Sequence, residues 1–112
     1  MSRISTHVLD TVRGRPAAGV AVSLALKTDE GWTEIGAAPT DEDGRVGNLL
    51  PDNVTHFTGT YRLRFDVGEY FAAQGVGTFY PYVEVVFTVT EDRPLHVPLL
   101  VSPFGYSTYR GS

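Results

Sequence analysis

The chain has 112 residues, 42% of them hydrophobic and 20% charged, which is typical of one globular domain over residues 1–112 and excludes a disordered chain. The absence of cysteine excludes disulfide scaffolds, thiolate zinc sites and cysteine nucleophiles. A net charge of −4 with a single lysine, Lys27, and no long apolar run argues against nucleic-acid and membrane partners, and the N-terminus has no signal-peptide pattern, so we expect a cytoplasmic protein.

Alternation of apolar and polar residues predicts β-strands along most of the chain. A first strand is expected over residues 4–11. In residues 20–27 the even positions are large and apolar, and residues 61–67 repeat the pattern at the odd positions. Residues 83–90 nearly do so too. Successive strand side chains point to opposite faces, so this period of two indicates strands with one buried face.

Turn residues separate these strands. Residues 29–31 predict a short hairpin loop, and residues 41–44 predict a second turn in which Gly44 is free to adopt a positive φ. Pro81, Pro98 and Pro103 lack a backbone N–H, so we expect them at strand ends or on edge strands.

One segment departs from the alternation. Residues 68–75 combine helix-tolerant side chains with a glycine at each end, which predicts a helix of about two turns with Gly75 as its stop. Seven or eight short strands and one small helix predict an all-β sandwich.

Three side chains in or beside predicted strands are candidates for chemistry. His7 lies in the first strand and His96 in an apolar strand near the end of the chain, and an imidazole titrates near neutral pH. Arg45 follows the predicted turn and can hold a carbonyl or an anion through its planar fork. A single histidine or arginine in such a position is more often structural or simply solvent-exposed than catalytic.

The C-terminal tail adds hydroxyl groups. Residues 106–112 read YSTYRGS and follow an apolar strand, so Ser107, Tyr109 and Ser112 belong either to a site or to an interface. His56 lies in a loop, and no function is expected of it. The chain has no phosphate-binding glycine loop, zinc-protease motif or nucleophile-elbow motif.

Three segments together resemble the transthyretin-like 5-hydroxyisourate hydrolases. They are STHVLD at residues 5–10 followed by GRPA at 14–17, TDEDGR at 40–45, and HVPLL at 96–100 running into SPFGYSTYRGS at 102–112. Residues 68–87 are similar to the family's helix and following strand. The closing YRGS is the most specific piece, because the hormone-carrying transthyretins share the fold without this tail.

The resemblance implies two four-stranded antiparallel sheets with one short helix, in a transthyretin-like β-sandwich. It also implies a homotetramer with active sites in a central channel, where dimers meet. The functional residues carried over are His7, Arg45 and His96, with Tyr109 and Ser112 from the tail and Ser107 as a weaker candidate.

The sequence departs from the family at one place. Members commonly carry His-Tyr-His where this chain has Pro94-Leu95-His96. Two candidate imidazoles per chain, His7 and His96, fall short of the three protein ligands of a catalytic zinc. We therefore expect no metal and no cofactor.

The activity implied is the opening of a cyclic amide of 5-hydroxyisourate by water, giving 2-oxo-4-hydroxy-4-carboxy-5-ureidoimidazoline in urate degradation. Either His7 or His96 is the base that activates water, and Arg45 faces the developing negative charge. Tyr109 and Ser112 would bind substrate or orient the water. The alternatives are a transthyretin-type carrier of a small aromatic ligand and a structural β-sandwich module.

Overall fold

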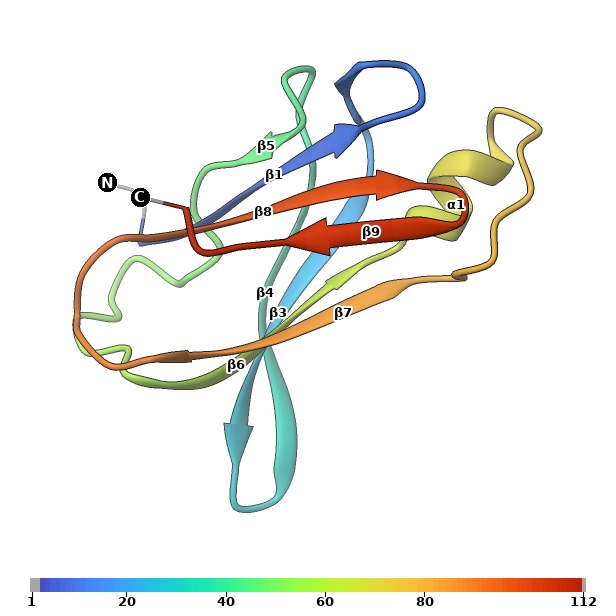
Figure 1. Ribbon diagram of the computed structural model, residues 1–112. Coiled ribbons are helices and arrows are strands. Elements are labelled where there is room, and N and C mark those ends of the chain that lie inside the picture. The colour runs from blue at the N-terminus through green and yellow to red at the C-terminus, as the bar shows by residue number, and fades with distance from the viewer. Residues whose placement is uncertain (1–2, 112) are drawn as a thin grey trace.

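The computed structural model describes residues 3–111, and its chain folds into two β-sheets packed face to face (Figure 1). In chain order the elements are β1 (Ile4–Asp10), β2 (Arg15–Pro16), β3 (Ala21–Thr28), β4 (Gly31–Pro39), β5 (Arg45–Val46), β6 (Gly59–Phe65), α1 (Val67–Ala72), β7 (Val83–Val89), β8 (Leu95–Ser102) and β9 (Gly105–Thr108). The predicted β-sandwich with one short helix is confirmed.

The two sheets differ in strand direction. One sheet has the order β4-β3-β6-β7 and is antiparallel throughout. The other has the order β2-β1-β8-β9, with β5 pairing to β1 as a fifth strand. In this second sheet β1 and β8 run parallel, so the expectation of two four-stranded antiparallel sheets is wrong for it. Parallel neighbours need a long connection, and here most of the chain, including the whole opposite sheet, separates β1 from β8.

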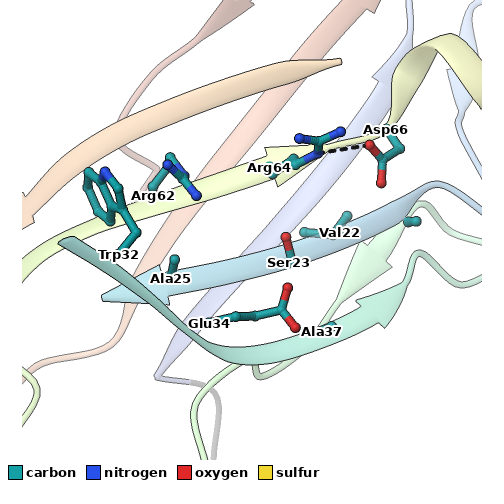
Figure 2. A pocket seen from close by; sticks show the side chains of 10 residues that line it. Val22, Ser23, Ala25, Trp32, Glu34, Ala37, Arg62, Arg64 and Asp66 are labelled. Carbon is teal, nitrogen blue, oxygen red and sulfur yellow. Dashed lines mark hydrogen bonds and ion pairs between the residues drawn. The ribbon is translucent and has the colours of Figure 1, made fainter. Parts of the chain in front are cut away.

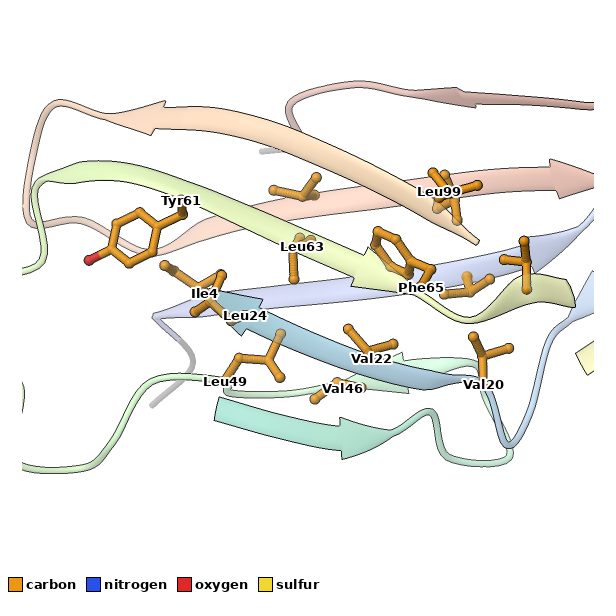
Figure 3. Close-up of a cluster of buried hydrophobic side chains, with 14 of the residues drawn as sticks. Ile4, Val20, Val22, Leu24, Val46, Leu49, Tyr61, Leu63, Phe65 and Leu99 are labelled. Atoms are coloured by element: carbon orange, nitrogen blue, oxygen red, sulfur yellow. The ribbon is translucent and has the colours of Figure 1, made fainter. Parts of the chain in front are cut away.

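The core lies between the sheets and contains the apolar positions that the alternation predicted (Figure 3). Leu24 of β3, Leu63 and Phe65 of β6, and Leu99 of β8 have no more than a trace of exposed surface. Tyr61 is also buried, and its hydroxyl donates to the carbonyl oxygen of Phe57 at 2.8 Å. Truncating such a buried side chain to alanine typically costs about 2–5 kcal/mol.

Strand β1 sets which side chains face outward. Its even residues, from Ile4 to Asp10, are buried, and its odd residues are half-buried. Two polar residues face inward and are satisfied there. Thr6 donates to the carbonyl oxygen of Val97 at 2.6 Å, and Asp10 accepts two backbone N–H groups and the Tyr70 hydroxyl. This register places Ser5 and His7 on the outer face of the five-stranded sheet.

Helix α1 begins one residue before the predicted segment and ends at Ala72. The chain then turns through Gly75, whose φ is +73°. The N–H of Gly75 donates to the carbonyl oxygen of Ala72, and that of Val76 donates to Phe71, which is the hydrogen-bond pattern of a Schellman motif. The prediction of Gly75 as the helix stop is confirmed. Within residues 3–111, no helix has the length and apolar character needed to cross a membrane.

The proline prediction holds at two of three positions. Pro81 precedes β7 and Pro103 lies in the turn between β8 and β9, whereas Pro98 lies inside β8, which is paired on both sides. Thr108 donates to the carbonyl oxygen of Pro98 at 2.7 Å, so the backbone polar groups of Pro98 face β9. Strand β9 ends at Thr108, opposite Leu99, and the tail pairs with β8 again only at the bridge between His96 and Gly111. The ladder is therefore interrupted opposite Pro98, which has no N–H to donate.

Candidate active site

His7 lies at the centre of the outer face of the five-stranded sheet. Its register partner on one side is Arg45 of β5, and on the other side it is Pro98 of β8. Its Nε2 atom is buried and has no hydrogen-bond partner among the described residues. A buried ring nitrogen without a partner is unusual and calls for an explanation.

Arg45 is held by a turn that is anchored to β1. The carboxylate of Asp41 accepts the N–H groups of Asp43 and Arg45, each at 2.9 Å, and the carbonyl oxygen of Gly44 accepts the N–H of Val8 at 2.7 Å. Gly44 has a φ of +75°, and a Cβ there would lie 2.5 Å from the carbonyl oxygen of Val8. Only glycine fits, so the turn presents the exposed Arg45 side chain at a fixed place beside His7.

His96 lies on β8, on the same outer face, and its register partner on β1 is Ser5. The Nδ1 atom of His96 and the hydroxyl oxygen of Ser5 are 2.9 Å apart and form a hydrogen bond. The tail returns along β8, and the N–H of Gly111 donates to the carbonyl oxygen of His96 at 2.7 Å. A Cβ at Gly111 would lie 2.8 Å from His96 Cδ2, so the tail glycine packs directly against the imidazole.

The pKa of His96 depends on its burial and on the two other predicted residues. Burial lowers the pKa of His96, and electrostatic repulsion from the neighbouring His7 and Arg45 lowers it further. His96 is therefore a neutral imidazole at neutral pH, able to accept a proton. The structure brings His7, Arg45 and His96 together on one face, with a guanidinium beside two imidazoles.

The tail residues are distributed differently. Tyr109 is 59% exposed and lines a mainly apolar groove with Val85, Phe87 and Leu95, between β7 and the tail. Ser107 is exposed on β9, opposite Leu100. Ser112 lies outside the described residues. None of the three grouped residues lines this groove, and the role of Tyr109 in substrate binding stays a prediction.

Sequence reasoning did not single out Ser5, which the structure shows to be the hydrogen-bond partner of His96. Ser5 is two residues from His7, so the period of two that defines β1 puts both side chains on one face. That signal was available in the sequence. The pairing of Ser5 with His96 was not, because it depends on the parallel register of β1 with β8.

The third histidine lies elsewhere. The ring of His56 is exposed and hydrogen-bonds the Asp92 carboxylate at 3.0 Å. This bond, together with the N–H of Phe57, lowers the pKa of Asp92. Among residues 3–111, no three His, Asp or Glu side chains gather as potential metal ligands.

A second hollow, of about 500 Å³, lies on the outer face of the opposite sheet (Figure 2). Its floor is formed by small residues such as Ser23 and Ala25, and Trp32 lies at its edge. The cations there already have partners. The Arg62 guanidinium lies 4.7 Å from the Trp32 ring centroid, and Arg64 bonds Asp66 at 3.0 Å. None of the predicted site residues lines this hollow.

Comparison with known proteins identifies the family of the chain. The model of the HIUase/Transthyretin family matches residues 4–111. The chain is 48% identical over 115 residues to the 5-hydroxyisourate hydrolase of Mus musculus, covering 99% of this chain and 96% of the mouse protein.

Two solved structures share its fold. The 5-hydroxyisourate hydrolase of Klebsiella pneumoniae has a TM-score of 0.86 at 35% identity and covers 100% of both chains. Sea bream transthyretin, in a crystal structure with thyroxine, has a TM-score of 0.88 at 36% identity and covers 96% of this chain and 93% of its own. The chain therefore belongs to the HIUase/Transthyretin family.

Proposed function

We propose that this chain hydrolyses 5-hydroxyisourate to 2-oxo-4-hydroxy-4-carboxy-5-ureidoimidazoline, a step of urate degradation. The observation that carries the proposal is the grouping of a neutral imidazole, a second imidazole and a guanidinium on one sheet face, His96, His7 and Arg45. The names of the mouse and Klebsiella relatives support the same activity.

His96 is the proposed base. As water attacks the amide carbonyl carbon, a water proton passes to the imidazole while the new C–O bond forms. When the C–N bond of the ring breaks, the imidazolium returns that proton to the leaving nitrogen. A positioned general base typically contributes about 10²–10⁴ in rate. The neutrality of His96 at neutral pH suits it to the first of these steps.

Arg45 and His7 are the proposed partners of the substrate. Arg45 is always protonated, and its fork can stabilise the negative charge that develops on the carbonyl oxygen. His7, the register partner of Arg45, would orient the substrate or the attacking water from the same face. Arg45→Lys keeps the charge but loses the fork, so reduced turnover in this variant supports the assignment and unchanged turnover removes Arg45 from the mechanism.

The same proposal includes a homotetramer whose channel contains the active sites. Tyr109 would then bind substrate, and the hydroxyls of Ser112 and Ser107 would orient substrate or water. Residues 1–112 act as one transthyretin-like hydrolase domain without a cofactor. Size-exclusion chromatography with light scattering tests the assembly, and cell fractionation tests the proposed cytoplasmic location.

A direct assay separates hydrolysis from the second candidate function, carriage of a small aromatic ligand. The fold shared with a thyroxine-bound transthyretin favours that second candidate. A urate oxidase generates 5-hydroxyisourate in situ, the protein is added, and the ultraviolet absorbance of the intermediate is followed. Decay faster than the spontaneous reaction supports the hydrolase. An unchanged decay, together with saturable binding of thyroxine, supports the carrier.

A further inference from the structure

The His96 ring is held at two places by groups outside the three catalytic candidates. Its Nδ1 atom hydrogen-bonds the hydroxyl of Ser5 at 2.9 Å, and its Cδ2 edge packs against Gly111. Within residues 3–111 the bond to Ser5 is the only hydrogen bond of the ring. The nitrogen left for other partners is therefore Nε2.

The direction of this hydrogen bond decides what Nε2 can do. A serine hydroxyl can donate or accept, and a neutral imidazole carries one proton. If Ser5 donates to Nδ1, the ring proton is on Nε2, and Nε2 cannot take a proton from water. If Nδ1–H donates to Ser5, the lone pair is on Nε2. Only the second arrangement is compatible with a base at Nε2.

The same arrangement also suits the protonated ring. After accepting a proton, the imidazolium donates from both nitrogens. The Ser5 oxygen can keep accepting from Nδ1–H through the whole cycle, without rotation of the ring or the hydroxyl. A bond in the opposite direction would have to break and re-form each time the ring changed protonation.

The geometry points to Ser5 as the positioning residue of His96: its hydroxyl oxygen accepts a hydrogen bond from Nδ1–H, holds the ring in place and keeps the lone pair on Nε2. This inference rests on the proposed hydrolase function for its kinetic consequence, but the hydrogen-bond direction can be measured without substrate. Ser5 touches neither substrate nor water in this role and acts through His96.

The test combines nuclear magnetic resonance with kinetics. Long-range ¹H–¹⁵N correlation of histidine side chains at neutral pH reports which ring nitrogen carries the proton. The chain has three histidines, His7, His56 and His96, so single His→Gln variants assign the signals. We expect the Nδ1–H form for His96 in the wild-type protein and a mixture of both forms in Ser5→Ala.

Kinetics supply the second measurement. Ser5→Ala is expected to lower kcat by at least about 10-fold, a part of the usual contribution of a positioned base, with little change in KM. Ser5→Thr keeps a hydroxyl on a strand residue and should restore most of kcat and the Nδ1–H form. The matched control is Ser23→Ala, because Ser23 is also a half-buried strand serine, but it lies on the opposite sheet.

Two results would overturn the inference. One is a wild-type His96 in the Nε2–H form. The other is a Ser5→Ala protein that is folded, with wild-type tautomer and kcat. If the wild-type protein does not accelerate decay of 5-hydroxyisourate at all, the proposed function fails, and the resonance measurement still decides whether Ser5 sets the tautomer.

Discussion

At the residue scale, the burial of His96 and the charges around it determine the pH response of the site. A lowered pKa means that His96 stays unprotonated until the pH falls below the ordinary histidine value of about 6.5. The acid limb of kcat/KM, which reports the free enzyme, should therefore lie below that value. Arg45→Met removes a positive neighbour, raises the pKa of His96 and moves the acid limb to higher pH.

The control for this prediction is Arg45→Lys, which keeps the positive charge and should leave the acid limb in place even where the rate falls. The measurement is kcat/KM across the acidic and neutral range for the three proteins. Superimposable acid limbs in Arg45→Met and the wild type would show that the base is not sensitive to this charge.

A second prediction at this scale concerns Gly111. A Cβ there would lie 2.8 Å from the His96 ring and 3.1 Å from its carbonyl oxygen, so Gly111→Ala must displace either the ring or the tail. We expect kcat to fall by about 10-fold or more, with little change in melting temperature, because Gly111 is near the chain end. In Gly105→Ala the nearest atom is 3.7 Å away, and this variant should keep wild-type activity. Equal activity of the two variants contradicts the contact.

At the scale of elements, strands were predictable and their pairing was not. Alternation located β1, β3, β6 and β7 to within two residues at each end, because a period of two depends only on local sequence. The parallel pairing of β1 with β8 depends on contacts between the two ends of the chain. The prediction for Pro98 was wrong for the same reason, since its place inside β8 depends on how distant segments pair with that strand.

The turn that carries Arg45 gives a prediction at this scale. Gly44→Ala must accept a positive φ and an overlap with the carbonyl oxygen of Val8, whereas Gly14→Ala has a φ of +67° and no atom within 4 Å. Overpacking typically costs about 1–3 kcal/mol, so Gly44→Ala should lose more unfolding free energy than Gly14→Ala by that amount. Urea unfolding measures both values. Equal losses would mean that the turn is free to move away from β1.

The hydrogen bond between helix α1 and strand β1 gives another prediction at this scale. The Tyr70 hydroxyl donates to the Asp10 carboxylate at 2.9 Å, and Asp10 is 1% exposed. Tyr70→Phe removes that donor, and hydrogen bonds to charged groups are worth about 1.5–3 kcal/mol. We expect a loss of this size in urea unfolding. Tyr82→Phe, which removes a hydroxyl from a 41% exposed ring, should be near neutral. A neutral Tyr70→Phe would contradict the account.

At the scale of the whole molecule, the candidate site is on the outside of the sandwich. The outer face of the five-stranded sheet carries His7, Arg45 and His96, and the core behind it is apolar. The resemblance to the family pointed to these three residues. The pairing of β1 with β5 explains why His7 and Arg45 are neighbours. The pairing of Ser5 with His96 and the groove that Tyr109 lines required the folded chain, because each joins distant segments.

His96, on the outer face of the five-stranded sheet, is the proposed general base of the reaction. The most direct test is the turnover of 5-hydroxyisourate by His96→Gln beside His56→Gln, an exposed histidine paired with Asp92. Loss of a general base predicts a fall of about 10²-fold or more for His96→Gln and wild-type turnover for His56→Gln, both measured above the spontaneous decay. Wild-type turnover in a folded His96→Gln protein would contradict the account.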